Sequence, residues 1–277
     1  MPKKKKFSEK IGFIGAGNMA KALIQGLIIN RAIVPGRIYV SAKTSKNLSK
    51  LKKKHKIKNT QNNLEIVDQC KMIILAVKPQ TIPDVCHQIS KHLNKNHLIV
   101  SIAAGITTQR LRELLKGHSR IIRAMPNTPC LIGYGATGIY CAKGTKPKDL
   151  TLTQILFNSV GISTIVKEEH LMNILTGLSG SGPAYVFMFL EAMINAGIKA
   201  GLNPKIALKL CSQTILGAIK LSLESPLSPQ ILRQNVTSPG GTTEAGLKVL
   251  EEEKFVQTLE NAIAFATQRS VELSKID

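Results

Sequence analysis

The stretch over residues 11–27, IGFIGAGNMAKALIQGL, constrains the fold of this 277-residue chain more than any other. A short apolar run stops at Gly15, a glycine-containing turn follows, and an apolar stretch with helical periodicity then begins. This order is typical of a strand, a tight turn and a helix that bind the pyrophosphate of a dinucleotide. The first glycine permits the turn, the second lets the backbone approach the phosphates, and a small Ala20 lets the helix pack closely. A tight turn without a ligand is the alternative. The predicted cofactor contacts in this turn are Gly15, Ala16, Gly17, Asn18, Met19 and Ala20.

Short apolar runs alternate with helical patterns as far as residue 166, which predicts an α/β fold with a doubly wound, mostly parallel sheet. The expected strands are residues 11–14, 38–40, 72–76, 98–102, 120–124, 137–140 and 162–166. The helices expected between them are residues 18–29, 47–55, 82–93, 108–115 and 148–158. Beyond residue 166 only helices are expected, at 168–178, 183–200, 204–221, 243–251 and 255–273. We therefore predict a Rossmann-type nucleotide-binding domain over residues 1–167 and an all-helical domain over 168–277.

The residues after the second expected strand bear on the choice of nucleotide. That strand is followed by Ser-Ala-Lys-Thr-Ser-Lys (residues 41–46), with no Asp or Glu. A carboxylate here would hold the ribose 2′-hydroxyl of NAD and repel the 2′-phosphate of NADP. Ser41, backbone N–H groups and Lys43 or Lys46 suit a 2′-phosphate instead. We expect NADP(H), with NAD(H) as the alternative. In the other interpretation of this stretch, Lys43 and Lys46 simply face water and bind no phosphate.

A second predicted contact region follows the third expected strand of the sheet. Ligands in such sheets lie beyond the carboxyl ends of the strands, so Ala76, Val77, Lys78 and Pro79 are expected to line the nucleotide cleft. Either the Lys78 side chain contacts a phosphate, or the loop backbone makes the contact and Lys78 stays in solvent.

Charge and cysteine content restrict the partners and the location. The net charge is +21, with many lysines in residues 3–6 and 43–58, but there is no Trp and no interleaved aromatic pattern. We therefore expect no specific nucleic-acid partner, only attraction of anionic ligands. The five cysteines are scattered, which predicts neither a metal site nor disulfides and favours a reducing compartment. With no apolar run of about 18 residues and no apolar leader, we expect no membrane span and a cytoplasmic location.

Two glycine-rich patches interrupt the helical half of the chain, at residues 177–185 and 238–244. In the second patch, Gly240 and Gly241 expose backbone N–H groups at the start of a helix, an arrangement that can receive a carboxylate. The simpler interpretation is that Thr242 or Thr243 is a plain helix N-cap.

Six segments together resemble the pyrroline-5-carboxylate reductase family, in the same order and spacing: IGFIGAGNMAKA, AVKPQ, SIAAGI, RAMPNTP, GLSGSGPAYVFMFLEAM and SPGGTTEAGLKVLE. The resemblance implies reduction of Δ1-pyrroline-5-carboxylate to L-proline by hydride transfer from NAD(P)H, the last step of proline biosynthesis. It also implies a helical dimerisation domain that intertwines with a second subunit, active sites built at the dimer interface, and dimers that assemble into decamers.

The resemblance assigns roles to individual residues. It places cofactor contacts on the turn from Gly15 to Ala20, on Asn63, and on the stretch from Ala76 to Pro79. It places the substrate carboxylate on the loop formed by Gly240, Gly241, Thr242 and Thr243. Thr243 matches the family threonine whose hydroxyl approaches the ring nitrogen, so we expect it to be the catalytic residue.

Two other function classes share parts of this plan. NADP-dependent β-hydroxyacid dehydrogenases also join a Rossmann domain to helices, but their chemistry needs a lysine beside the substrate hydroxyl. Neither SGSGPAY nor SPGGTT contains a lysine. A non-catalytic protein that binds NADP as a sensor is the second alternative.

Overall fold

A computed structural model describes residues 7–274, with the side chains of all of these except residues 46 and 47. The lysines at positions 3–6 and the side chain of Lys46, considered above, lie outside this description. The chain forms two compact units. Unit 1 runs up to Ser181 and resumes at Ala264, and unit 2 comprises Gly182–Ile263. The functional boundary predicted at residues 167 and 168 stays a prediction.

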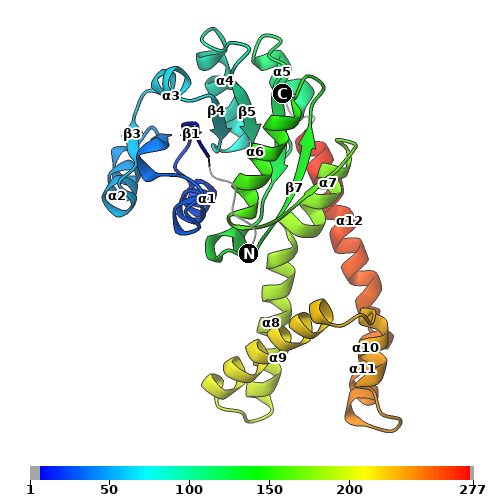
Figure 1. The fold of residues 1–277 in the computed structure, drawn as a ribbon. Helices are drawn as coiled ribbons and strands as arrows, with labels where there is room; N and C mark the ends of the chain where they lie inside the picture. The colour runs from blue at the N-terminus through cyan, green and yellow to red at the C-terminus, as the bar shows by residue number, and fades with distance from the viewer. Residues whose placement is uncertain (1–6, 275–277) are drawn as a thin grey trace. The chain divides into compact units, whose positions relative to one another are not determined.

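Unit 1 is built on an eight-stranded sheet with the order β3-β2-β1-β4-β5-β6-β7-β8 (Figure 1). All neighbouring strands are parallel except β6 and β7, which are antiparallel. The predicted doubly wound, mostly parallel sheet is therefore confirmed. Its strands are β1 (Ile11–Ile14), β2 (Ile38–Ser41), β3 (Lys58–Thr60), β4 (Met72–Leu75), β5 (Leu98–Ser101), β6 (Ile121–Met125), β7 (Gly135–Cys141) and β8 (Gly161–Ile165).

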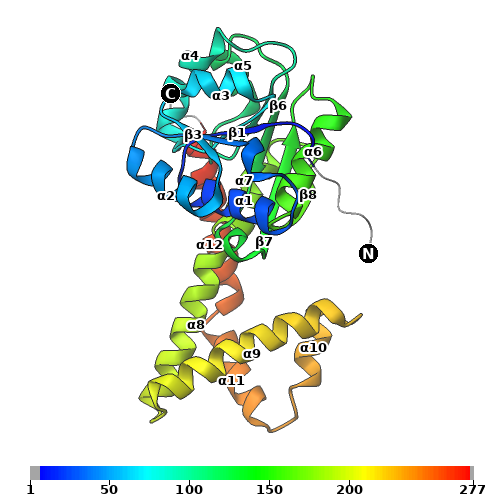
Figure 2. The same cartoon turned by 60° about the vertical axis from the view of Figure 1, so that its left-hand side comes forward.

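Helices cover both faces of this sheet (Figures 1 and 2). Strand β4 shows why, because alternate side chains point to opposite faces: Ile74 joins one apolar core and Ile73 the other. All residues of β1, β2, β4 and β5 are buried, as expected for parallel strands covered on both sides. The covering helices are α1 (Asn18–Ile29), α2 (Ser45–His55), α3 (Asn63–Gln69), α4 (Ile82–Ser90), α5 (Thr108–Leu114), α6 (Pro147–Asn158) and α7 (Leu171–Leu175).

The elements that the sequence predicts in this region agree with the structure to within a few residues, but two were missed. Strand β3 lies at the edge of the sheet and reads Lys-Asn-Thr, so it carries no apolar run. Helix α3 has only seven residues, and the Asn62 side chain caps it by accepting a hydrogen bond from the Leu64 N–H. The helix predicted over 168–178 is also different, because α7 is followed by a π-helix at Thr176–Gly180.

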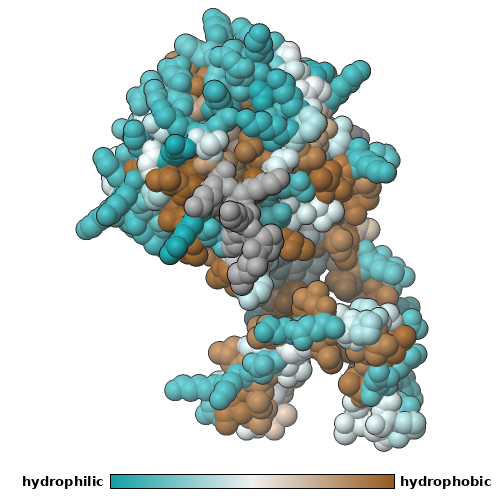
Figure 3. All heavy atoms as spheres, viewed as in Figure 1, coloured by the Kyte–Doolittle hydropathy of each residue, from teal (hydrophilic) through white to brown (hydrophobic). Residues whose placement is uncertain are grey.

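Unit 2 is entirely helical. It contains α8 (Gly182–Lys199), α9 (Pro204–Glu224), α10 (Pro229–Asn235), α11 (Thr242–Glu252) and the first part of α12 (Phe255–Leu273). The short α10 was not predicted. Ala207 is the only buried residue in Gly182–Ile263, so this unit has almost no core of its own. In Figure 3, hydrophobic side chains are exposed over much of its surface.

Among the described residues, α9 is the one helix long and apolar enough to cross a membrane by length and composition. The sequence prediction of no such segment overlooked it, because its polar residues interrupt every long apolar run. A single helix of this kind is weak evidence for a membrane span, because core helices of soluble proteins pass the same test.

Candidate functional site

The turn after β1 has a geometry that only glycine allows. Gly15 has φ +110°, and a Cβ atom placed on it would lie 2.4 Å from the carbonyl oxygen of Ala76. Backbone hydrogen bonds hold the turn between its neighbours: the Gly15 N–H donates to Ser41 O (2.9 Å), and the Ala76 N–H donates to Ile14 O (2.8 Å). The ends of three strands are thereby brought into close contact.

The start of α1 presents free backbone groups at this turn. Gly17 is the N-cap residue, no side chain caps the helix, and its first turn contains no acidic residue. A Cβ on Gly17 would meet only the Ala76 carbonyl oxygen, at 3.9 Å, so the space above the helix start is open. The first N–H groups of a helix have no intrahelical partners and lie at its positive end, which suits a phosphate. Ala20 is buried against the sheet, as the sequence predicts.

A chain of polar side chains lies at the end of β2. The buried Ser41 hydroxyl donates to Asn63 Oδ1 (2.6 Å), and Asn63 Nδ2 donates to Gln88 Oε1 (2.8 Å). This chain fixes the orientation of the Asn63 amide. Gln88 was not predicted, because no local pattern on α4 signals a contact made across 25 residues of sequence.

Strand register shows that the predicted cofactor residues converge. Ile14 pairs with Ser41 on one side and with Leu75 on the other, so the residues that follow β1, β2 and β4 share one edge of the sheet. The strand order reverses at β1, and ligands of open α/β sheets bind outside the carboxyl ends at such a switch point. In the loop after β4, Lys78 is exposed and its carbonyl oxygen accepts from the Thr81 N–H (2.9 Å).

The Met-Pro-Asn loop after β6 is fastened to the glycine-rich segment that precedes α8. Asn127 Nδ2 donates to Ser179 O (3.0 Å), while its Oδ1 accepts from the Ala136 N–H (2.9 Å). Gly180 lies against Met125, whose Cε would be 2.8 Å from an added Cβ. Both segments stand out in the sequence, but nothing in their composition indicates that they touch.

A partly buried polar network joins α7 and α12 to the sheet within unit 1. Arg123 on β6 contacts Glu169 (3.4 Å) and Asn173 (3.2 Å), and Ser270 of α12 donates to Asn173 Oδ1 (3.0 Å). Burial lowers the pKa of Arg123, and the nearby Glu169 opposes that shift. Glu169 also accepts from the backbone N–H and the hydroxyl of Thr108, at 2.7 and 2.6 Å. The network is a structural tie, and no sequence pattern predicted it.

The loop before α11 in unit 2 corrects one interpretation of the sequence. The N-cap of α11 is Gly241 and no side chain caps the helix, so Thr242 and Thr243 occupy its first two positions. The N-cap role considered for these threonines is therefore wrong. Both side chains are exposed, which leaves the Thr243 hydroxyl accessible.

Some backbone N–H groups of this loop already donate hydrogen bonds within the chain, and others have no acceptor in the helix. Gly240 has φ +71°, and its N–H donates to the Glu244 carboxylate (2.7 Å). The Gly241 N–H donates to Ser238 O (2.9 Å). The N–H groups of the first turn of α11, which starts at Thr242, have no intrahelical carbonyl to bond and can receive an anion.

Ionisable groups do not gather into a metal centre. Among residues 7–274, no group of three or more His, Cys, Asp or Glu side chains is placed to hold a metal ion. Burial raises the pKa values of the Cys70 and Cys86 thiols to about 12, so both are protonated and unreactive near neutral pH. The cysteines are free, without disulfides.

Family models match both the glycine-turn region of unit 1 and the helical part of the chain. The family model for the pyrroline-5-carboxylate reductase dimerisation domain matches residues 169–273, and the model described as NADP oxidoreductase, coenzyme F420-dependent, matches residues 10–105. The pyrroline-5-carboxylate reductase of Arabidopsis thaliana is 38% identical over 268 residues, covering 97% of this chain and 96% of that protein.

Solved structures agree as well. A pyrroline-5-carboxylate reductase from Coxiella burnetii has 39% identity and a TM-score of 0.91, covering 98% of this chain and all of that one. The Plasmodium falciparum enzyme, solved with NADP bound, has 33% identity and a TM-score of 0.89, with 98% and 100% coverage. Because the similarity is well above what fold alone requires and spans both units, this chain belongs to the pyrroline-5-carboxylate reductase family.

Proposed function

We infer that this protein reduces Δ1-pyrroline-5-carboxylate to L-proline, using NADPH as the hydride donor. The observation that carries this conclusion is family membership over nearly the full chain at 38–40% identity. The glycine turn at the sheet's switch point and the absence of a carboxylate after β2 support NADP(H) as the cofactor. The NADP-bound relative from Plasmodium falciparum supports the same choice. NADH remains the alternative donor.

In this proposal unit 1 binds and orients the cofactor. The first turn of α1, after Gly15 and Gly17, receives the pyrophosphate. Asn63, oriented by the buried Ser41, binds the ribose end, and the exposed Lys43 and backbone N–H groups after β2 bind the 2′-phosphate. The loop after β4 closes the cleft along the nucleotide. Bound NADPH supplies the hydride, so the protein needs few ionisable catalytic groups. The proposed cofactor contacts are Gly15, Ala16, Gly17, Asn18, Met19, Ala20, Ser41, Asn63, Ala76, Val77, Lys78 and Pro79.

Unit 2 binds the imine in the same proposal. The N–H groups at the start of α11 hold the substrate carboxylate, with Gly240, Gly241 and Thr242 shaping the loop. Glu244 already occupies the Gly240 N–H, so the substrate uses the N–H groups that follow it. The Thr243 hydroxyl hydrogen-bonds the ring nitrogen as the imine becomes an amine. Such a bond to a charged group contributes roughly 1.5–3 kcal/mol.

A second copy of the chain completes the molecule. Unit 2 matches a dimerisation domain, and its helices expose large apolar side chains such as Leu223 (80%) and Met188 (74%). Exposure on this scale is unstable in water unless another surface covers it. We propose a homodimer through these helices, active sites shared between its two subunits, and assembly of dimers into a decamer.

If the second subunit covers the apolar surface of α9, that surface needs no membrane to bury it. The proposed dimer therefore argues against a membrane as the partner of α9. Basic residues on α2 lack the interleaved aromatic side chains that single-stranded nucleic acid stacks on. We therefore propose a cytoplasmic enzyme with no specific nucleic-acid partner.

The direct test follows the loss of reduced nicotinamide absorbance with Δ1-pyrroline-5-carboxylate as the substrate. We expect turnover with NADPH, lower efficiency with NADH, and none with 3-hydroxyisobutyrate and NADP⁺. Turnover of the hydroxyacid would favour the dehydrogenase alternative. NADPH binding without oxidation in the presence of the imine would favour a sensor and overturn the proposal.

A further inference from the structure

A polar cavity lies at the opposite edge of the sheet from the cofactor residues. It has a volume of about 420 Å³ and is formed where three loops meet, namely those after α4, after α5 and before α6. These loops adjoin the amino ends of β5 and β6, because Ile99 pairs with Ile121, and Ile122 with Cys141 at the end of β7. The cofactor residues follow the carboxyl ends of β1, β2 and β4, so the two sites do not overlap.

The lining of this cavity is strongly basic. It includes Lys95, Lys116, Arg120 and Lys146, and no Asp or Glu. Within residues 7–274, no carboxylate lies within ion-pair distance of the three lysines, whereas Arg120 pairs with Asp149. Three lysines from three separate loops therefore line one polar hollow; of these, Lys146 interacts electrostatically with Asp149, while Lys95 and Lys116 have no ion-pair partner among the described residues.

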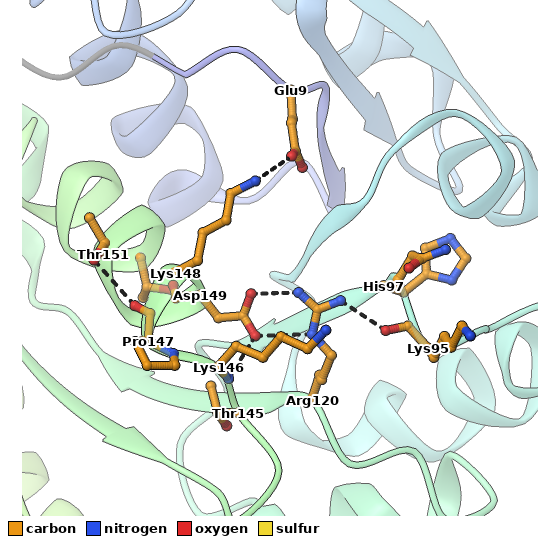
Figure 4. Close-up of polar contacts among 12 residues, drawn as sticks. Glu9, Lys95, His97, Arg120, Thr145, Lys146, Pro147, Lys148, Asp149 and Thr151 are labelled. Atoms are coloured by element: carbon orange, nitrogen blue, oxygen red, sulfur yellow. Dashed lines mark hydrogen bonds and ion pairs between the residues drawn. The ribbon is translucent and has the colours of Figure 1, made fainter.

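Hydrogen bonds around Arg120 and Asp149 fix the wall of the cavity (Figure 4). Arg120 Nε donates to Asp149 Oδ2 (3.0 Å), and its Nη1 donates to the Lys95 carbonyl oxygen (2.9 Å). Asp149 is only 1% exposed and also accepts from the Lys146 N–H (3.0 Å). The Arg120–Asp149 pair thus holds the backbones that carry two of the lysines, Lys95 through the guanidinium group and Lys146 through the carboxylate.

Three further features hold the loops in place. Lys116 and Gly117 both have positive φ (53° and 85°), forming the tight turn that ends α5. Gly144 packs directly on Ser119, whose Cβ would be 2.8 Å from an added Cβ. His118 lies in the wall with its Nε2 3.0 Å from the His97 carbonyl oxygen. The cations are therefore presented by ordered turns.

We propose that this cavity binds a small anion with two or more phosphate groups, independently of the cofactor. Lysine ammonium groups are point charges on flexible stems that bind phosphate oxygens well, and three of them on different loops match several phosphates better than one. The volume is in the range of small-molecule sites. The lining contains no Phe, Tyr or Trp on which a nucleobase would stack, which favours a compact polyphosphate over a nucleotide.

The test uses full-length protein saturated with NADP⁺, so that the cofactor site is already filled, and inorganic pyrophosphate as the probe. Isothermal titration calorimetry should give saturable binding with one site per chain. The double variant Lys95→Gln/Lys116→Gln should weaken binding at least about tenfold. The control Lys91→Gln/Lys167→Gln removes the same charge from exposed positions outside the cavity and should change affinity by less than about twofold.

Thermal unfolding gives a second measurement. Pyrophosphate should raise the Tm of NADP⁺-saturated wild type and of the control, and raise that of the Lys95→Gln/Lys116→Gln variant less. Equal weakening in both variants would show a delocalised charge effect and overturn the proposal. So would absence of binding once NADP⁺ is bound, since the probe would then occupy only the cofactor site. Neither result bears on the reductase activity.

Discussion

At position 15, one methyl group decides whether the first turn of the sheet can close. The positive φ of Gly15 and the 2.4 Å approach of a Cβ to the Ala76 carbonyl oxygen leave no room for alanine. Gly17 differs, because a Cβ there is 3.9 Å from the nearest atom. The sequence motif predicted Gly15 correctly as the tight-turn residue, because its need is local and steric; the role of Gly17 beside the phosphates stays a prediction.

These two glycines give a paired prediction. Gly15→Ala should lower stability by about 1–3 kcal/mol through backbone strain and also weaken NADPH binding. Gly17→Ala should fold normally but weaken NADPH binding about tenfold or more, because its methyl group intrudes on the phosphate. Urea unfolding and NADPH fluorescence titration measure the two effects. Normal NADPH affinity in Gly17→Ala would remove this turn from the phosphate site.

Thr243 gives a second prediction at this scale. Thr243→Ala should lower kcat/KM about ten- to a hundredfold, because a hydrogen bond to the reacting nitrogen is lost. Thr243→Ser, which keeps the hydroxyl, should retain most activity. Thr242→Ala is the matched control on the adjacent residue. If Thr243→Ala retained full activity, the residue would have no part in the reaction.

Sequence reasoning at the residue scale failed where a role depends on the exact start of an element. Thr242 and Thr243 fit the composition of an N-cap, but Gly241 occupies that position. Because the helix starts one residue earlier than a Thr242 N-cap requires and two earlier than a Thr243 N-cap requires, neither hydroxyl caps it and both face solvent. Contacts between distant segments, such as Asn63 with Gln88 and Asn127 with Ser179, carry no local signal at all.

Among the elements, α6 depends on a single buried carboxylate at its start. Burial alone would raise the pKa of Asp149, but hydrogen bonds from Arg120 and from the Lys146 N–H, and the charges of both residues, bring it below its ordinary value. A pKa that is lower in the folded state contributes stability above the unfolded value of about 3.9, and this contribution is lost as pH falls through the folded value.

Asp149→Asn should therefore lower the free energy of unfolding by about 3 kcal/mol at pH 7, because Arg120 is left without its charged partner. The difference from wild type should shrink as pH falls below about 4, where the wild-type carboxylate is also protonated. Urea unfolding across pH 3–7 measures this. A pH-independent difference would show that the lost stability comes from packing and not from charge.

Elements with strong periodicity were predictable, and weak ones were not. The four fully buried strands are short apolar runs, and α1 and α12 have the bounds expected from their patterns. The missed elements β3, α3 and α10 are three or seven residues long and polar or capped by side chains. These elements form because of neighbouring strands and capping side chains, and the periodicity of a single segment gives no information about either.

At the scale of the whole molecule, the main feature of unit 2 is that it has almost no hydrophobic core of its own. Helix α9 exposes large apolar side chains, among them Leu216 at 49%, Ile219 at 58% and Leu223 at 80% exposure. Periodicity predicted these helices except α10 but not their lack of a core, because amphipathicity does not say whether the covering surface lies in the same chain. Only the family resemblance indicated a covering second subunit.

Ile219→Glu should therefore shift the protein toward smaller species and reduce activity, since a charge replaces an apolar contact between subunits. Gln213→Glu adds the same charge at an exposed polar position of the same helix and should leave assembly unchanged. Size-exclusion chromatography with light scattering measures the mass. An unaltered mass for Ile219→Glu would place the subunit interface elsewhere on unit 2.

The return of α12 into unit 1 has a consequence for biosynthesis. Ser270 contacts Asn173, which contacts Arg123, so this tie within unit 1 can form only after the whole of unit 2 has been synthesised. During synthesis, the apolar helices of unit 2, from Gly182 onward, leave the ribosome while unit 1 still lacks the segment that begins at Ala264. A nascent chain therefore exposes the apolar surface of unit 2 before unit 1 is complete, and during this interval it is prone to aggregate.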